Sequence, residues 1–357
     1  MAKISIIVPT YNERENLPIL VEEIHNSLSN FDYELVIVDD NSPDGTGELA
    51  ERLSREKPIK VIHRRGKLGL ASAVVEGFKH SEGDILGVMD ADLQHPPRDI
   101  PKLLKEAEKA DIVIGSRYVE GGGVEKWSFN REFISRMAKL LPQILFAKVR
   151  PIKDPLSGFF LVKKRVIEGI DLNPVGYKIL LEVLVKGRHN NVVEVPYVFK
   201  GRERGKSTFG AREQINYLRH LWRLAWSEGE ILRFIKFCLV GLSGFAVNLG
   251  FYWLFTRNFG LHELASFFVS TELSIINNFT WNELWTFRDR RYSTSPASIS
   301  GRGLKFHLVA WVGAGPSIAS FWGLIRFAGV FDLIAAVLAI IIATVLKFIV
   351  NIVWTWR

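Results

Sequence analysis

The chain has 357 residues, a formal net charge of +8, 48% hydrophobic residues and a single cysteine. One cysteine excludes a disulfide framework and any zinc or iron–sulfur site that needs several thiolates. Apolar residues are concentrated after Arg233, whereas the residues up to Trp226 have the mixed composition of a soluble domain. The composition therefore predicts a soluble domain over residues 1–228 and a membrane domain over residues 229–357.

Short β-rich runs alternate with amphipathic stretches in the first part of the chain. Strands are expected at residues 4–9, 34–39, 59–63, 85–90, 112–116, 159–162 and 192–198. Helices are expected at residues 17–28, 46–55, 70–79 and 100–109. This alternation predicts an α/β fold with a mostly parallel sheet that helices cover on both faces. Ligands bind beyond the carboxyl ends of such strands, so the residues after each strand are the candidate site residues.

Two basic amphipathic segments accompany this domain, at residues 129–148 and 212–226. Their apolar residues recur at helical spacing, and arginine and lysine residues flank them. A basic amphipathic helix next to a membrane domain is expected to lie in the plane of the lipid headgroups. The alternative is a helix that packs on the core of the soluble domain.

Four apolar stretches follow, at residues 234–256, 264–287, 304–328 and 331–356. Each exceeds the ~20 residues that a helix needs to cross a bilayer, so four transmembrane helices are expected. The loop between the second and third stretches is rich in arginine. By the positive-inside rule this loop, the soluble domain and both termini are expected in the cytoplasm. The positive charge then suits membrane lipids and phosphates, and the sequence carries no motif for binding nucleic acid.

The sequence Asp90-Ala91-Asp92-Leu93-Gln94, here the acidic turn, continues directly from an apolar strand. Two carboxylates and a carboxamide at alternating positions suit a hard cation, Mg²⁺ or Mn²⁺, whose coordination substrate phosphates would complete. The alternative is a solvated turn. The histidines of this part of the chain are interpreted as turn or surface residues rather than metal ligands: His63, His80 and His95.

The polar residues after the first two strands argue against two classes of enzyme. Neither a G-x-G-x-x-G motif nor a G-x-x-x-x-G-K-[ST] motif is present, which disfavours a dinucleotide-dependent oxidoreductase and a P-loop enzyme. Asp39 and Asp40 instead end the second strand, where a carboxylate can bind ribose hydroxyls or the edge of a base. Asp44 and Thr46 have an alternative explanation as caps of the next helix.

Residues 3–215 contain, in order, the motifs PTYNERENLP, DDNSPDGT, GKLGLASA, DADLQHPP, GSRY and GRERGKS. Together these motifs resemble the dolichol-phosphate mannose synthases, which are inverting family 2 glycosyltransferases with the GT-A fold. The apolar region from residue 233 resembles the GtrA-type membrane domain, through its hydropathy and the stretch NNFTWNELWTF.

The resemblance implies an enzyme that moves mannose from GDP-mannose to dolichyl phosphate at the cytoplasmic face, giving dolichyl β-D-mannosyl phosphate and GDP. The guanosine part of the donor would contact Pro9, Tyr11, Glu13, Val38 and Asp40. The diphosphate would contact Asp90, Ala91, Asp92 and Gln94, with the metal on Asp90, Asp92 and Gln94. The lipid phosphate would contact Arg117, Arg131 and Ser135, while Arg117, Arg202 and Lys206 would also contact the nucleotide sugar. Catalysis is expected from Asp90, Asp92, Arg117, Arg131 and Ser135.

A phosphate acceptor has chemical needs that these residues can meet. Its second pKa near ~6 leaves it ionised at neutral pH, so it needs positioning and charge neutralisation rather than a general base. Arg131 and Ser135 are four residues apart, hence on one face of a helix. Two alternatives stay open at this point: a polyprenyl-phosphate glucosyltransferase that uses UDP-glucose, and a non-catalytic translocase of lipid-linked sugars.

Overall fold

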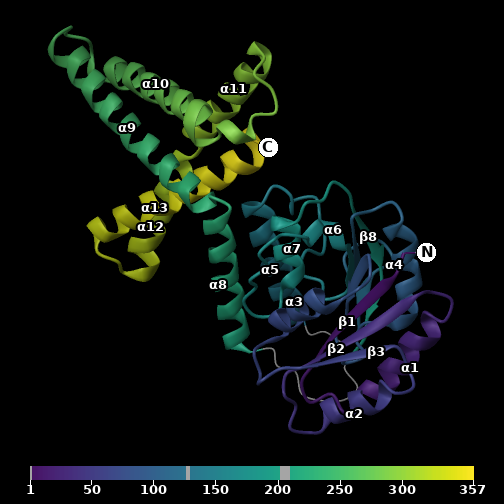
Figure 1. The fold of residues 1–357 in the computed structure, drawn as a ribbon. Helices are drawn as coiled ribbons and strands as arrows, with labels where there is room; N and C mark the ends of the chain where they lie inside the picture. Colours follow the sequence, from purple (N-terminus) through teal and green to yellow (C-terminus); the bar gives the residue numbers. More distant parts are fainter. Residues whose placement is uncertain (1, 126–128, 202–209) are drawn as a thin grey trace. The chain divides into compact units, whose positions relative to one another are not determined.

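The computed structural model describes residues 2–125, 129–201 and 210–357. The chain divides into two units, Met1–Leu224 and Ala225–Arg357, and each unit has its own hydrophobic core (Figure 1). All the strands lie in the first unit, whereas the second unit is built from helices in the described part of the chain.

A seven-stranded sheet forms the centre of the N-terminal unit. Its strands are β1 (Ile4–Thr10), β2 (Tyr33–Asp39), β3 (Ile59–His63), β4 (Ile85–Val88), β5 (Ile112–Ser116), β7 (Phe160–Lys163) and β8 (Val192–Pro196). Their order is β3-β2-β1-β4-β7-β5-β8, and the neighbouring pairs are parallel except where β7 takes part. The predicted mostly parallel sheet is therefore confirmed. Because β7 is antiparallel, it begins at the edge of the sheet where β4 and β5 end.

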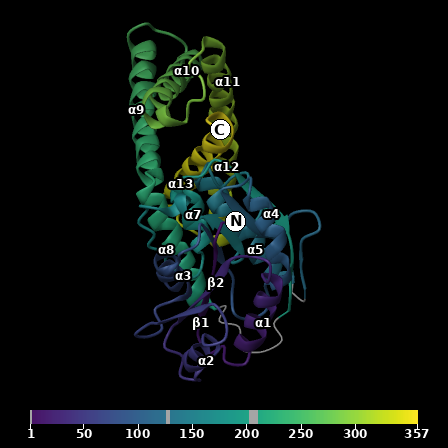
Figure 2. The ribbon, with the colours of Figure 1, turned by 45° about the vertical axis from the view of Figure 1, so that its right-hand side comes forward.

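Helices cover both faces of this sheet. They are α1 (Leu17–Ser27), α2 (Thr46–Leu53), α3 (Leu70–His80), α4 (Ile100–Ala107), α6 (Lys164–Ile167) and α7 (Ile179–Lys186). Since side chains alternate between the faces of a strand, Ile6 and Ile37 share one core with residues of α1, α2 and α4. On the other face α3 packs so closely that a Cβ on Gly77 would lie 2.5 Å from Ile7. Figure 2 shows β1 and β2 between α3 on one side and α1 on the other.

The two amphipathic segments are helices, α5 (Phe129–Leu145) and α8 (Ala211–Ser227). Both expose large apolar side chains, among them Phe133 and Met137 on α5 and Leu218 and Trp222 on α8. Leu221, three residues after Leu218, is buried. A short second sheet in this unit pairs β6 (Gly123–Val124) with β9 (Val198–Phe199).

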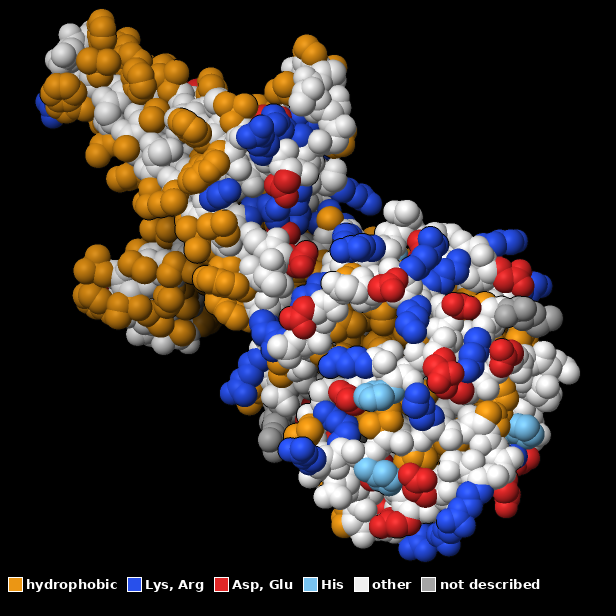
Figure 3. Space-filling model, viewed as in Figure 1, with side chains coloured by type: hydrophobic (Ala, Val, Ile, Leu, Met, Phe, Trp, Pro, Cys, Tyr) orange, Lys and Arg blue, Asp and Glu red, His pale blue; other side chains and the backbone are white. Residues whose placement is uncertain are grey.

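The C-terminal unit contains α9 (Glu230–Arg257), α10 (Glu263–Trp281), α11 (Pro296–Val312), α12 (Ala314–Ala328) and α13 (Asp332–Val350). Short π- and 3₁₀-helical turns follow α10 as η2 (Asn282–Thr286) and η3 (Arg288–Arg290), and η4 (Asn351–Thr355) follows α13. Two helical segments in the described residues are long and apolar enough to cross a membrane, Glu230–Arg257 and Asp332–Thr355. Hydrophobic side chains cover much of the visible surface of this unit, whereas charges of both signs cover the N-terminal unit (Figure 3).

The third predicted membrane span, residues 304–328, is not one helix in the structure. α11 ends at Val312 and α12 begins at Ala314, on either side of Gly313. Pro316 has no N–H to donate to the Val312 carbonyl one turn earlier, and its ring would clash with that carbonyl in a continuous helix. A Cβ on Gly313 would lie 2.3 Å from Lys347 Cε, so the break is also a point of close packing against α13.

Candidate active site

The candidate site lies at the edge of the sheet where β4 and β5 end and β7 begins. The acidic turn follows β4 there, and Leu93 within it has a φ of 60°. Leucine rarely adopts this left-handed conformation, and such strain is typical of functional sites whose surroundings enforce it. Asp92 Oδ1 accepts a hydrogen bond from the Gln94 N–H at 3.2 Å, and Gln94 Nε2 donates to the Lys200 carbonyl at 2.9 Å. These contacts hold the two carboxylates on one short turn.

The oxygen atoms of the acidic turn fit a divalent cation that also binds phosphate. The Asp90 side chain is 30% exposed and therefore accessible to a ligand, whereas Asp92 and Gln94 are buried. In the described parts of the chain, no three His, Cys, Asp or Glu side chains converge as a metal site. Two carboxylates and one amide are thus an incomplete set on their own. They become a suitable set for Mg²⁺ or Mn²⁺ when substrate phosphates supply the remaining oxygens.

His95 supports the acidic turn through a hydrogen bond to its backbone. Its Nδ1 accepts a hydrogen bond from the Asp90 N–H at 3.1 Å, so the neutral ring carries its proton on Nε2. Burial lowers the pKa of His95 to about 4, which keeps the ring neutral at physiological pH. His95 lies in the bend after this turn, but the expectation of a surface position is wrong, because three aromatic rings from distant parts of the chain enclose it: Phe159, Tyr197 and Phe199.

The loop before β7 closes against the same turn. A Cβ on Gly158 would lie 3.1 Å from His95 Cε1 and 3.2 Å from Asp90 Oδ2, so only glycine fits there without displacement. Ser157 Oγ donates to the Gly115 carbonyl at 2.7 Å and ties this loop to β5. The antiparallel course of β7 thus brings a segment far along the chain against the acidic turn.

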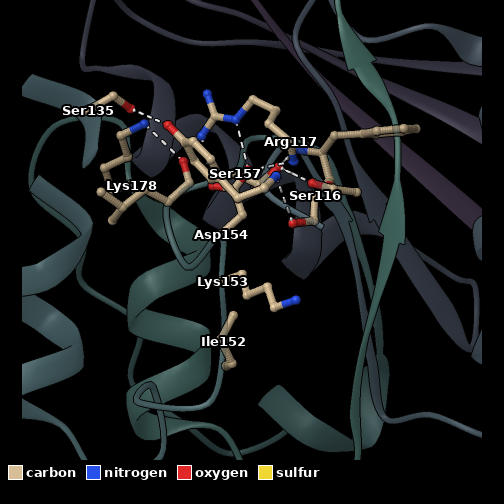
Figure 4. Close-up of polar contacts among 12 residues, drawn as sticks. Ser116, Arg117, Ser135, Ile152, Lys153, Asp154, Ser157 and Lys178 are labelled. Atoms are coloured by element: carbon tan, nitrogen blue, oxygen red, sulfur yellow. Dashed lines mark hydrogen bonds and ion pairs between the residues drawn. The ribbon is translucent and has the colours of Figure 1, made fainter. Parts of the chain in front are cut away.

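Arg117, which follows β5, is held by a buried carboxylate from that loop (Figure 4). Its Nε and Nη2 each donate to one oxygen of Asp154 at 2.8 Å, and its backbone N–H donates to Asp154 Oδ2 at 3.0 Å. Burial opposes ionisation of Asp154, but the Arg117 guanidinium outweighs it and holds the pKa of Asp154 below its ordinary value. Glu194 in turn accepts from the backbone N–H groups of Lys153 and Asp154. The guanidinium is therefore fixed in one orientation.

Helix α5 contributes to the same region through Ser135. The Ser135 hydroxyl lies 2.9 Å from the Tyr118 hydroxyl, and Lys139 Nζ lies 3.7 Å from the centre of the Tyr118 ring. Burial lowers the pKa of Lys139. Lys178 Nζ donates to the Leu156 carbonyl at 2.9 Å beside the Asp154 loop (Figure 4).

The residues expected at the nucleotide follow β1 and β2. The Asp40 carboxylate accepts from Arg64 Nη1 at 2.5 Å and from the N–H groups of Leu68 and Gly69 at 3.1 and 2.9 Å. It thereby orders the loop that carries Lys67, whose Nζ lies 3.9 Å from the centre of the Tyr11 ring. Asp40 acts in the structure as the anchor of this loop.

The remaining nucleotide candidates lie beside this loop. Pro9 and Val38 are buried register partners of β1 and β2. The Glu13 N–H donates to Thr46 Oγ1 at 3.0 Å, and Glu13 Oε2 accepts from Asn16 Nδ2 at 2.7 Å. These contacts order the turn after β1.

Asp39, the other carboxylate at the end of the second strand, joins the ends of β1 and β2. Its Oδ1 accepts from the hydroxyls of Thr10 at 3.0 Å and Ser42 at 2.6 Å. Asp39 also lines a cavity of about 380 Å³ beside α2, together with His63 and other residues. Pro9, Tyr11, Glu13, Val38 and Asp40 do not line that cavity.

Several site residues were missed, and others lie outside the described structure. Asp154, Lys139 and Lys178 were not among the candidates, although the pairing of Arg117 depends on Asp154. The sequence did offer one signal, since Asp154 directly precedes a Pro-x-Ser-Gly sequence. No regular spacing along the chain, however, connects Asp154 with Arg117. Arg202 and Lys206 lie outside the described residues. Arg131 belongs to α5, but its side chain is likewise outside the described structure.

Comparison with known proteins finds similarity over almost the whole chain. Residues 5–170 match the glycosyl transferase family 2 domain, and residues 236–356 match the GtrA/DPMS transmembrane domain. A dolichol-phosphate mannosyltransferase from Pyrococcus furiosus is 49% identical over 99% of this chain and 99% of its own length. The Saccharomyces cerevisiae dolichol-phosphate mannosyltransferase is 36% identical over 65% of this chain and 92% of its own. A polyprenol monophosphomannose synthase from Mycolicibacterium smegmatis is 38% identical over 57% and 79% of the two chains.

Proposed function

The chain belongs to the dolichol-phosphate mannosyltransferase family, and from this membership we propose that it moves mannose from GDP-mannose to dolichyl phosphate. As a member it is an inverting glycosyltransferase that transfers a mannosyl group to a polyprenyl phosphate, and it is a membrane protein. The proposal adds the guanosine donor, the dolichyl carrier and the divalent metal.

The observation that supports the site best is the shared support of the acidic turn and Arg117. His95 holds the backbone of Asp90, and its ring lies 5.5 Å from that of Phe199. The Arg117 guanidinium lies 5.6 Å from the centre of the same Phe199 ring. One aromatic cluster therefore spaces a carboxylate turn and a fixed cation, which suits a reaction between two phosphate-bearing substrates.

On the acceptor side, the residues supply position and positive charge. A polyprenyl phosphate is ionised at neutral pH and needs no enzyme base to become a nucleophile. Arg117, kept in orientation by Asp154, and Ser135 and Arg131 on α5 are proposed to bind this phosphate. A direct attack of one phosphate oxygen on the anomeric carbon breaks its bond to the donor diphosphate. The single displacement inverts that carbon and gives the β-linked product.

On the donor side, Asp90, Asp92 and Gln94 are proposed to hold Mg²⁺ or Mn²⁺ against the donor diphosphate. Such an ion supplies Lewis-acid stabilisation of the negative charge on the leaving group. Ala91 at the middle of the turn, and Arg202 and Lys206, are proposed to contact the diphosphate as well. Tyr11, Glu13, Pro9, Val38 and Asp40 are proposed to surround the guanosine.

Transfer of labelled mannose to an organic-extractable lipid tests this function. The full-length protein is incubated with GDP-mannose and dolichyl phosphate, in Mn²⁺, in Mg²⁺ or in EDTA. Metal-dependent transfer supports donor, carrier and metal together. Transfer from UDP-glucose, or to undecaprenyl phosphate alone, would replace the proposed donor or carrier and leave the family unchanged. Full activity in EDTA would remove the metal from the proposal.

The variant Asp92→Asn tests the acidic turn itself. Asparagine keeps the oxygen that accepts from the Gln94 N–H and removes only the charge. Transfer should fall at least ~100-fold, as it does when one electrostatic stabiliser of a transition state is lost, while the melting temperature stays unchanged. Asp84→Asn, at the amino end of the same strand and exposed, is the matched control and should retain full activity. Equal activities of the two variants would contradict the assignment.

A further inference from the structure

A cavity of about 610 Å³ lies within the C-terminal unit, at the start of α9 and beside η2 and η3. Four basic residues line it: Arg233, Lys236, Arg288 and Arg291. Two acidic residues, Glu228 and Asp289, line it as well. All the lining residues belong to the C-terminal unit, and basic side chains outnumber acidic ones among them.

Two of the acidic groups nearby, Asp289 and Glu230, are already engaged with arginines. Asp289 pairs with Arg233, and Glu230 pairs with Arg233 and, at 2.6 Å, with Arg290. By contrast, no carboxylate in the described part of the chain forms an ion pair with Lys236, Arg288 or Arg291. Glu228 lines the cavity too, and Lys236 Nζ lies 5.3 Å from the centre of the Trp285 ring, but positive charge still exceeds negative charge around the cavity, which favours an anionic ligand.

Two buried donors next to the cavity also lack partners. Arg233 is 8% exposed and Thr286 only 2% exposed, and both residues line the cavity. Among the described residues, no hydrogen-bond partner is found for Arg233 Nε or for Thr286 Oγ1. Buried polar groups are normally hydrogen-bonded, so donors left in this state indicate a ligand that brings acceptor oxygens.

The remaining wall of the cavity is apolar and exposed. Leu232, Leu284 and Trp285 line it and expose 56%, 55% and 42% of their surfaces. Leu232 lies near the start of α9, and Leu284 and Trp285 lie in η2, at the end of the second apolar stretch. The ends of apolar stretches are where a membrane interface is expected. A ligand that occupies this site thus meets basic groups on one side and hydrocarbon on the other.

We propose that this cavity binds the phosphate group of an anionic membrane lipid. Lys236, Arg288 and Arg291 recognise the phosphate charge, and Arg233 and Thr286 supply further donors. Basic pockets between membrane helices at the interface are suited to such headgroups. The site does not depend on sugar transfer, because its residues belong entirely to the C-terminal unit.

Lipid binding to the delipidated full-length protein tests the site. Native mass spectrometry measures the affinity for phosphatidylglycerol and, separately, for dolichyl phosphate. The double variant R288Q/R291Q should bind about tenfold more weakly, a loss of ~1.4 kcal/mol. The control R257Q/R326Q removes the same charge from exposed positions elsewhere in the same unit and should bind as the unchanged protein does.

The two lipids distinguish the source of the phosphate. Weaker binding of phosphatidylglycerol identifies a structural phospholipid site, whereas weaker binding of dolichyl phosphate alone identifies a site for the carrier lipid. If R288Q/R291Q does not fold, the single variant K236Q should still weaken binding about threefold. Unchanged affinity for both lipids, or an equal loss in the control, overturns the proposal. Because binding is the readout, failure of the sugar-transfer assay does not affect this result.

Discussion

At the scale of single residues, the Arg117–Asp154 ion pair determines how the site presents its positive charge. Asp154 is 1% exposed and uses both oxygens on Arg117. A bidentate pair fixes the plane of the guanidinium, which lysine in the same place would not do. The pair therefore serves orientation, and its contribution to stability depends on both partners being present.

The variants Asp154→Ala and Arg117→Ala test this coupling. Asp154→Ala leaves a buried guanidinium without its counter-charge and should destabilise the protein by about 3–5 kcal/mol. The double variant should be less destabilised than the sum of the single variants, since removal of both partners leaves no unpaired charge. Thermal unfolding of the three variants measures the coupling. Strictly additive losses would show that the two side chains act independently.

His95 makes the stability of the N-terminal unit depend on pH. Its pKa is lowered from 6.5 to about 4 in the folded protein, so the unfolded chain binds more protons between these values. The neutral His95 ring therefore contributes to the free energy of unfolding above pH 6.5. This contribution, roughly 3 kcal/mol in total, is lost as the pH falls toward 4. Melting temperatures across this range should fall less steeply in His95→Gln than in the unchanged protein. His220→Gln should flatten the curve as well, since burial lowers the pKa of His220 to about 4.

At the scale of the elements, α8 has two apolar faces with different roles. Tyr217, Leu221 and Leu224 are buried against the N-terminal unit, and His220 Nδ1 accepts from the Val175 N–H at 3.2 Å. Leu218, one turn before Trp222, is 55% exposed. An exposed apolar face flanked by basic residues is what an interfacial membrane helix requires. Core packing therefore holds for the buried side of this helix, and we propose the membrane interface for its exposed side.

Leu218 and Leu221 form a matched pair that separates these roles. Leu221→Ala removes a buried side chain and should destabilise the protein by about 2–5 kcal/mol. Leu218→Ser should leave the melting temperature unchanged and lower transfer to dolichyl phosphate in vesicles, because the helix loses contact with lipid. Transfer to a short-chain, water-soluble polyprenyl phosphate is the control and should be unaffected in Leu218→Ser. Equal loss with both acceptors would contradict an interfacial role.

At the scale of the whole molecule, the apolar surface of the C-terminal unit and its family make the chain a membrane protein. We propose four spans, with the third formed by α11 and α12 together. Glu283 and Arg302 support this bundle, because they form a bidentate pair at 3.0 and 2.6 Å and Trp356 Nε1 donates to Glu283 at 2.9 Å. The arginine-rich segment between α10 and α11 is proposed to face the cytoplasm.

Cysteine accessibility tests the number of spans and their orientation. In a Cys238→Ser background, Thr294→Cys lies between α10 and α11 and Asn258→Cys follows α9; both positions are exposed. An impermeant maleimide should label Asn258→Cys in intact cells and Thr294→Cys only in inverted vesicles. The background protein without cysteine should remain unlabelled. Labelling of both positions from one side would rule out a span at α10.

Much of the fold and part of the site were predictable because they depend on residues close together in the chain. The starts of α1, α2, α3 and α4 at Leu17, Thr46, Leu70 and Ile100 coincide with the predicted starts. The acidic turn was recognisable for the same reason, since Asp92 and Gln94 are two positions apart. Gly313 and Pro316 were a local signal too, but the high apolar content of residues 304–328 outweighed them.

The sequence by itself therefore determined the α/β class, the separation of a membrane unit and the acidic turn. Only the tertiary structure decided which groups surround that turn. Asp154 meets Arg117 across 37 positions, and His95 meets the ring of Phe159, just before β7, and the ring of Phe199 in β9. Both depend on β7 entering the sheet antiparallel between β4 and β5, a pairing that local hydropathy does not encode. Such contacts join residues far apart in the chain. They form only after the strands have taken their order in the sheet, so the local sequence does not reveal them.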